Sequence, residues 1–354
     1  MAGAIPRREL TLILTDLYLP PEVREALAVA VEPPAALPVL EHVFARASAR
    51  EARDWRELAA AVAGVHVSGA MPVAAVSVAA CAREVDRTVQ WWVLTPVCLQ
   101  AAHDHVKLAQ VVPLQAGEWA QVAAGLQREF GADLASLRIP DPLPAPGAGA
   151  EAYVAVREPL EATTTDPLRI VGRDVSASLP EGAQGGMLRR LMTELQMWLH
   201  GHPINVEREM RGLPTANALW FWGGGVLPAQ VRNGSAAELP ALYSDDCFLR
   251  GLWTLRGKQV ASLPQGAEAR RMTIAGSFAR AAIASLSLAE LPGNTWQERL
   301  GALDREWLGP IVGAMRAGGL EKLALQVNDV LWTLRARDLW RVWRRPRPWL
   351  EAIA

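Results

Sequence analysis

An aspartate at the end of a predicted strand is the first candidate for chemistry. The apolar run from Leu10 to Leu14 predicts a buried strand, and Asp16 follows it by two residues. Sites in open parallel sheets form beyond the carboxyl ends of the strands. A carboxylate in this place could bind a metal ion. The alternative is a carboxylate that caps a helix or closes a loop.

Two pairs of histidines have spacings that suit metal ligands. His103 and His105 flank an aspartate, and an extended His-x-His segment places both imidazoles on one face of a strand. A solvent-facing turn is the alternative, because the sequence shows no partner cysteine or carboxylate cluster. His200 and His202 flank a glycine and could supply two ligands from a loop. For them the alternatives are a histidine at a helix end and a histidine packed in the core.

The most unusual stretch covers residues 194–228. Apolar residues at helical spacing lead up to it, and Pro203 predicts that this helix ends near His200. Asn205 is a suitable N-cap for a second short helix over 206–211.

Three consecutive glycines follow a predicted strand. The apolar run 218–222 suits a strand buried on both faces of a parallel sheet. Gly223, Gly224 and Gly225 then leave it, and their amide groups could cradle a phosphate. A tight exit turn is the alternative, since the GxGxxG and GxxxxGK[ST] patterns are absent.

Polar and aromatic residues on either side of that strand form a second candidate group. Asn205, Arg208 and Asn217 could form a hydrogen-bonded brace between two parts of the molecule, or they could line a ligand cleft at the joint. His202 and Trp220 belong to the same stretch. Loss of ligand binding in Arg208→Ala without a change in melting temperature would favour the cleft.

The carboxyl-terminal segment combines tryptophan with arginine. Trp340, Trp343 and Trp349 alternate with several arginines over residues 338–349. Such a segment could contact phosphates, nucleic acid or a protein partner. The alternative, which we prefer, is tryptophan packed on the core with arginine at a helix end.

Composition indicates a globular protein. The chain has 354 residues, of which 51% are hydrophobic and 21% charged, and a net charge of -1. The length predicts two domains, or one large domain with an insertion. The three cysteines, Cys81, Cys98 and Cys247, lack CxxC spacing and suit reduced thiols. With neither a membrane-length apolar run nor a signal peptide, we expect a cytoplasmic protein.

The order of elements predicts an α/β fold. Strands are expected at 10–14, 90–94 and 106–112, and a strand pair at 320–334. Helices are expected at 37–61, at 117–130 and, ending near residue 200, from Leu188.

Several segments resemble a known family. HPIN…R…GLPTANALWFWGGG, ELQMWLHGHPIN and RDLWRVWRRPRPW resemble the archaeal-type cofactor-independent phosphoglycerate mutases and, more closely, the bacterial RpfE-type regulatory proteins. The resemblance implies an alkaline-phosphatase-like α/β sheet flanked by helices, with a smaller α+β insertion. It implies a discontinuous core over 1–100 and 205–354 and an insertion domain over 101–204.

The resemblance also implies a site. Active members of the superfamily hold two metal ions with Asp and His ligands and transfer a phosphoryl group through a Ser or Thr. Asp16 matches the first ligand and Ser68 lies near the place of the nucleophile. No histidine follows His202, where further ligands are expected. The sequence therefore predicts an incomplete two-metal site and no cofactor, with Mn or Zn only if the protein is an enzyme.

Three functions follow from these patterns. The first is a phosphoglycerate mutase-like regulatory protein that binds a small phosphorylated ligand or a protein partner. The second is an active metal-dependent mutase or phosphotransferase with a rearranged site. The third is an interaction module that uses the Trp/Arg segment. Neither a membrane nor nucleic acid is expected as a partner, given the net charge.

Overall fold

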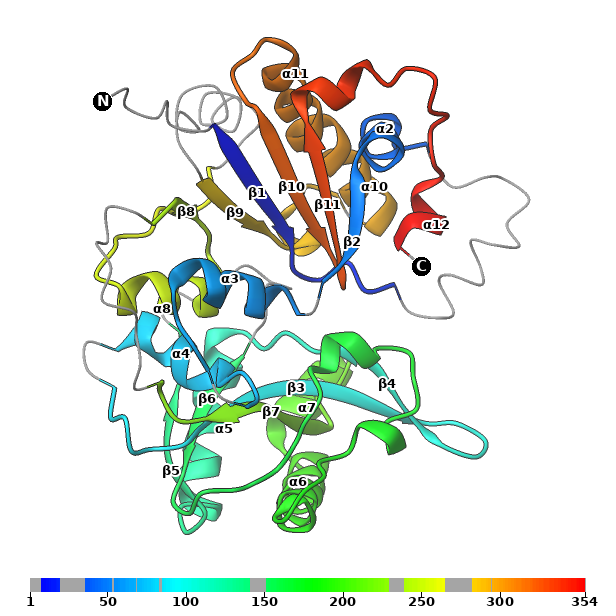
Figure 1. The fold of residues 1–354 in the computed structure, drawn as a ribbon. Coiled ribbons are helices and arrows are strands. Elements are labelled where there is room, and N and C mark those ends of the chain that lie inside the picture. The colour runs from blue at the N-terminus through cyan, green and yellow to red at the C-terminus, as the bar shows by residue number, and fades with distance from the viewer. Residues whose placement is uncertain are drawn as a thin grey trace.

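The computed structural model describes residues 8–19, 36–52, 54–67, 69–82, 85–140, 151–228, 239–264, 282–293 and 295–353. They form two β-sheets, each covered by helices on both faces, with one helical layer shared between them (Figure 1). The predicted α/β class is confirmed. In these ranges no helix is long and apolar enough to cross a bilayer.

The larger sheet has six strands in the spatial order β2, β11, β10, β1, β9, β8. β10, β1, β9 and β8 are parallel neighbours, and β11 and β2 add antiparallel pairings. Leu12 and Ile13 of β1 belong to apolar clusters on opposite faces, so β1 is buried on both sides. The strands are β1 (Glu9–Leu14), β2 (Ser48–Glu51), β8 (Ala241–Tyr243), β9 (Ala282–Leu286), β10 (Lys322–Val327) and β11 (Val330–Arg335).

The smaller sheet is antiparallel throughout. β3 lies at its centre and pairs with β4, β6 and β7, and β5 pairs with β6. β7 was expected in a parallel sheet; it is buried as predicted, but it runs antiparallel to β3 and the parallel assignment is wrong. The strands are β3 (Trp91–Ala101), β4 (Val106–Val111), β5 (Leu134–Arg138), β6 (Ala152–Val156) and β7 (Ala218–Gly225).

Helices form three layers around these sheets (Figure 1). The outer face of the larger sheet carries α2 (Pro38–Arg46), α10 (Trp296–Ala302), α11 (Gly309–Arg316) and α12 (Trp349–Ile353). Between the sheets lie α3 (Trp55–Ala63), α4 (Val73–Cys81) and α8 (Cys247–Leu255). The outer face of the smaller sheet carries α5 (Ala116–Glu129), α6 (Gly185–His200) and α7 (Pro203–Met210).

Two helix predictions need correction. Residues 37–61 form α2, β2 and α3 rather than one helix, because the chain becomes extended at Ala47 and Asp54 caps a new helix by accepting a hydrogen bond from the Arg56 amide. α7 starts at Pro203, not after Asn205. Proline suits the first helical position, and His202 supplies the cap, its Nδ1 accepting from the Ile204 amide.

The sheets group the chain differently from the predicted domains. β3 and β7 were assigned with residues 1–100 and 205–354, yet both pair within the smaller sheet. That sheet therefore draws its strands from residues 91–225. The division at 101–204 stays a prediction about domains, since the helices between the sheets contribute to a core that both sheets share.

Candidate functional site

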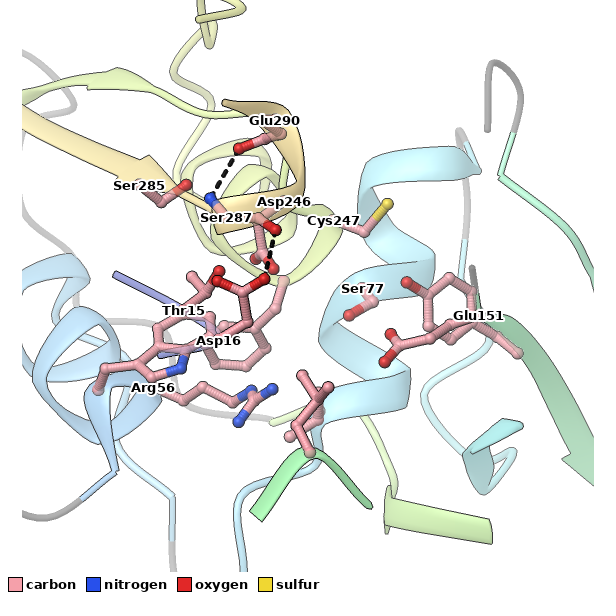
Figure 2. A pocket seen from close by; sticks show the side chains of 15 residues that line it. Thr15, Asp16, Arg56, Ser77, Glu151, Asp246, Cys247, Ser285, Ser287 and Glu290 are labelled. Atoms are coloured by element: carbon pink, nitrogen blue, oxygen red, sulfur yellow. Dashed lines mark hydrogen bonds between the residues drawn. The ribbon is translucent and has the colours of Figure 1, made fainter. Parts of the chain in front are cut away.

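A small pocket lies where parallel strands of the larger sheet end. Asp16 follows β1, Asp246 follows β8 and Ser287 follows β9, so three carboxyl ends meet there as expected for an α/β sheet. α3, α4 and β6 close the opposite side (Figure 2). The pocket has a volume of about 40 Å³. Its polar lining consists of Thr15, Asp16, Arg56, Ser77, Glu151, Tyr153, Asp246, Cys247, Ser285, Ser287 and Glu290.

Hydrogen bonds hold the Asp16 carboxylate to the end of β9. The Ser287 hydroxyl donates to its Oδ2 at 2.6 Å, and the Leu288 amide donates to its Oδ1 at 2.7 Å. The Ser287 amide in turn donates to Glu290 at 2.8 Å (Figure 2). Asp16 thus fixes the segment after β9 as well as lining the pocket.

Three further carboxyl groups in the pocket hold their protons more tightly than usual. Burial, together with the neighbouring Asp245 and Asp16, raises the pKa of Glu290 to about 7. Burial, with a smaller effect from Asp166, raises the pKa of Glu151 to about 8. Burial also raises the pKa of Asp246. Near neutral pH part of this acidic lining is therefore uncharged and can donate hydrogen bonds.

Arg56 is the cation among the described residues that line the pocket. Its guanidinium lies 3.0 Å from Asp166 and 3.3 Å from Asp54, and it stacks on the rings of Trp55 and Trp222. Burial alone would lower the pKa of Arg56, but the two carboxylates outweigh it and raise the pKa. The Arg56 Nε atom is buried without a hydrogen-bond partner in the described structure.

The arrangement combines acids of near-neutral pKa with hydroxyl groups and one guanidinium. A carboxyl group that titrates near pH 7 can give or take a proton at neutral pH. Ser77 of α4 and Ser285 of β9 add hydroxyls, and the Ser285 hydroxyl lies 2.6 Å from that of Ser244. Such a lining suits a small ligand rich in oxygen atoms.

Of the predicted catalytic pair, the structure places only Asp16. Ser68 lies outside the described residues. The histidine pairs are not in the pocket. His105 is exposed and bonds to Asp104 at 2.7 Å, while His202 caps α7 and contacts the Trp198 ring. Burial lowers the pKa of His202.

The second predicted group lies around the smaller sheet. The Asn205 side chain donates to the Leu199 and Ala216 carbonyl oxygens and accepts from the Ala216 amide. The Asn217 side chain pairs in the same way with the amide and carbonyl of Leu99. These bonds connect α6, α7 and β3 to the segment before β7.

Arg208 forms a buried ion pair with Glu118. Its guanidinium lies 2.7 Å from the Glu118 carboxylate and also donates to the Pro214 carbonyl. Glu118 belongs to the capping box of α5, so the pair ties α7 to the start of α5. The Trp220 indole donates to the Thr165 carbonyl at 2.9 Å.

The three glycines are in close contact with neighbouring elements. A Cβ on Gly224 would lie 2.5 Å from the Trp92 ring, and one on Gly225 would lie 2.6 Å from Pro72. Gly223 has φ 60°, and its Cβ would lie 2.8 Å from that of Val73. This close approach of β7 to α4 and Trp92 accounts for the glycines. Their part in ligand binding stays a prediction.

The sequence interpretation missed most of the pocket. Asp246 and Glu290 follow the short strands β8 and β9, which were not among the predicted strands. The rule that identified Asp16, a polar residue close behind the end of a parallel strand, would have pointed to Asp246 and Ser287 but not to Glu290, which lies further along the chain. Arg56 and Glu151 reach the pocket from α3 and the start of β6, and no local pattern marks them.

Comparisons with known proteins place the chain near one enzyme class. No family model matches. The chain is 31% identical over 173 residues to a 2,3-bisphosphoglycerate-independent phosphoglycerate mutase of Methanothrix thermoacetophila. The aligned region covers 48% of this chain and 44% of that protein. It is 30% identical over 132 residues to the protein of the same name from Methanosarcina barkeri, 37% of this chain and 33% of that protein. The matches thus span less than half the length of these relatives.

Two solved structures are similar over most of the chain. One is a cofactor-independent phosphoglycerate mutase from Thermoplasma acidophilum, with 15% identity, a TM-score of 0.39, and coverage of 92% of this chain and 88% of that one. The other is the PH0037 protein from Pyrococcus horikoshii, with 13% identity, a TM-score of 0.48, and coverage of 94% and 88%. The sequence relatives alone establish a distant, phosphoglycerate mutase-like relationship.

The prediction of no cofactor needs correction. The sequence relatives are phosphoglycerate mutases, and the family resemblance implies Mn or Zn for that class. The described residues do not fit the usual Asp and His ligand set. Over those ranges no three His, Cys, Asp or Glu side chains converge as metal ligands, and both Asp16 oxygens accept hydrogen bonds.

Proposed function

We propose that this protein is a phosphoglycerate mutase-like, ligand-binding regulatory protein of the RpfE type that acts in the cytoplasm. The pocket at the ends of β1, β8 and β9 would take a small phosphorylated ligand. One observation carries the proposal: Asp16, to which the family resemblance assigns the role of first metal ligand, is hydrogen-bonded to Ser287 and Leu288 at the end of β9. The resemblance of the central and carboxyl-terminal motifs supports the RpfE type.

The lining supports recognition through hydrogen bonds. Asp246, Ser287 and Glu290 stand at the ends of β8 and β9, and no imidazole is among the described lining residues. Protonated Glu151 and Glu290 can donate to phosphate oxygens, and Arg56 supplies positive charge. A pocket of about 40 Å³ has room for roughly three water molecules. The lining must therefore open to admit a phosphorylated three-carbon acid.

Binding of 3-phosphoglycerate at two pH values tests the proposal. Titration calorimetry should show binding that is roughly tenfold tighter at about pH 6 than at about pH 8.5, because Glu290 repels the ligand once it ionises. Glu290→Gln should keep the binding and reduce its pH dependence. Asp104→Asn, at an exposed position, should behave as the wild type. Absence of binding at both pH values would refute the proposal.

The competing function is a metal-dependent mutase with a rearranged site. The Asp16 carboxylate favours it, because it lines the pocket at the carboxyl end of β1, where the family resemblance implies the first metal ligand. Metal analysis of the purified protein and a mutase assay with Mn²⁺ decide between the two. If the wild type shows mutase turnover and the Asp16→Ala variant does not, the protein is an enzyme and the proposed regulatory function is wrong.

Exposed tryptophans favour a second role as an interaction module. Trp340 is 80% exposed and Trp343 is 74% exposed, whereas Trp349 is buried and contacts Trp296. The expected packing on the core holds for Trp349 alone. With arginines around them, the exposed pair suits an acidic protein partner. A partner captured by the wild type and lost in the Trp340→Ala/Trp343→Ala variant would support this role. Equal capture by both would contradict it.

A further inference from the structure

Two helices of the shared layer approach each other closely beside the pocket. α4 and α8 meet where Gly251 faces the Val76 carbonyl, and a Cβ at Gly251 would collide with that oxygen. Cys81 lies five residues after Val76, and Cys247 lies four residues before Gly251. Because the two cysteines also contact each other, the helices run antiparallel, and the cysteines lie about one turn beyond the contact between Gly251 and Val76.

The two thiols are neighbours in space. The side chains of Cys81 and Cys247 are hydrogen-bonded to each other. Cys81, at the last position of α4, is exposed. Cys247, at the first position of α8, is partly buried and lines the pocket (Figure 2). It is also hydrogen-bonded to Tyr153. The third cysteine, Cys98, is in β3 and is only partly exposed.

We propose that Cys81 and Cys247 form a peroxide-sensitive dithiol, a modification site that becomes a disulfide between α4 and α8 at the wall of the pocket. The inference rests on the thiol pair and the helix packing, and it is independent of the proposed ligand.

The chemistry needs only a hydroperoxide as oxidant. The Cys81 thiolate attacks the peroxide; the O–O bond breaks, Cys81 becomes a sulfenic acid, and the departing oxygen leaves as water or an alcohol after taking up a proton. The Cys247 sulfur then attacks the sulfenic sulfur. An S–S bond forms, the S–O bond breaks, and the hydroxyl group leaves as water with the Cys247 proton. The two thiols lose two electrons, which reduce the peroxide.

The surroundings assign the two roles. The hydrogen bond from Cys247 lowers the pKa of Cys81, and Arg250 lowers it further against the effect of burial. Cys81 is therefore the thiol that is exposed and more readily ionised, as an attacking sulfur must be. The hydrogen bond with Cys81 and burial raise the pKa of Cys247, which suits the second, resolving thiol. Burial raises the pKa of Cys98, which makes it a matched control.

Disulfide formation would change one wall of the pocket. The Cys247 sulfur would rotate toward Cys81 to form the S–S bond. Its hydrogen bond with Tyr153 would then be lost. Asp246, which precedes Cys247, caps α8 by accepting from the Leu249 amide. The oxidised form would therefore constrain the start of α8, next to an acidic group of the lining.

Thiol counting and peptide mapping of the full chain test the inference. The reduced protein is treated with hydrogen peroxide, the peroxide is removed, and free thiols are counted under denaturing conditions. We expect the count to fall from three to one and to return with dithiothreitol. Non-reducing peptide mapping of the wild type should show one cross-linked peptide that joins Cys81 to Cys247.

Variants add a second readout. Cys98→Ser should still lose two thiols, whereas Cys81→Ser and Cys247→Ser should form no intramolecular disulfide. The wild-type peptide map does not depend on whether these variants fold. A disulfide through Cys98, a disulfide between molecules, or stable sulfinic acid at Cys81 without a cross-link would each overturn the inference.

Discussion

Glu290 shows how the environment of one residue sets its chemistry. An ordinary glutamate is ionised at neutral pH, but burial and nearby carboxylates raise the pKa of Glu290 from 4.5 to about 7. Its Oε2 still accepts a hydrogen bond from the Ser287 amide. The side chain thus has a fixed position and a proton that it can release near neutral pH, and both properties depend on contacts that sequence spacing does not show.

Replacing Glu290 with glutamine should stabilise the protein increasingly as the pH rises from 4.5 to about 7, with the full effect above that window. Between pH 4.5 and about 7 the folded protein retains a proton that the unfolded chain releases, so the wild type loses stability as the pH rises through this window. Glutamine removes this loss. We expect Glu290→Gln to be more stable than the wild type by about 2 kcal/mol at pH 8 and equal to it at pH 4.5, after discounting partial exposure. Urea unfolding at both pH values measures this, and an identical difference at both would contradict it.

Buried polar contacts connect the elements of the smaller sheet. The sequence left two roles open for Arg208: a brace or part of a ligand cleft. Its guanidinium is hydrogen-bonded to Glu118, which belongs to the capping box of α5, and to the backbone carbonyl of Pro214. The brace therefore stays our prediction for Arg208, because a ligand would have to compete with an existing buried ion pair.

Removing Arg208 should cost stability. Arg208→Ala leaves the buried Glu118 carboxylate without its partner, which costs about 3 kcal/mol in comparable buried pairs. Arg190→Ala, at an exposed i,i+4 pair with Glu194, should have little effect on stability and serves as the control. Chemical unfolding measures both. An unchanged melting temperature for Arg208→Ala, with loss of ligand binding, would show that the brace is not the role of this residue.

The glycines at the end of β7 should tolerate no side chain. Gly224→Ala places a methyl group 2.5 Å from the Trp92 ring, and overpacking of this kind costs about 2 kcal/mol. Gly117→Ala, at a helical position where nothing lies within 4 Å of the added atom, should not destabilise the protein. Thermal unfolding compares the two variants. A Gly224→Ala variant as stable as the wild type would show that contact with Trp92 does not account for the glycine.

At the scale of the whole molecule, the sequence predicted the strongly patterned parts. β1, α5, α6 and the strand pair β10–β11 are confirmed, since each has a long apolar pattern with clear ends. The position of Asp16 followed from the same logic. The antiparallel pairing of β7 with β3 could not be predicted, because a strand buried on both faces has the same apolar sequence pattern in a parallel and in an antiparallel sheet.

The pocket itself depends on long-range packing. Arg56 reaches the pocket from α3. Its partner Asp166 lies in the segment between β6 and α6. Arg169 of that segment also bonds to Asp329 after β10, at 2.9 Å. Ion pairs thus connect the segment after β6 to α3 and to the turn between β10 and β11. They join residues more than 100 positions apart, which no local sequence pattern can reveal.

The most direct measurement is a crystal structure of the protein grown with 3-phosphoglycerate and Mn²⁺, with anomalous data at the manganese edge. The account predicts ligand density in the pocket at the ends of β1, β8 and β9, within hydrogen-bond reach of Glu290 and near Asp16. Ligand density elsewhere, or an empty pocket, would contradict it. Two manganese peaks bound by Asp16, together with mutase turnover, would contradict the regulatory role and establish the enzyme.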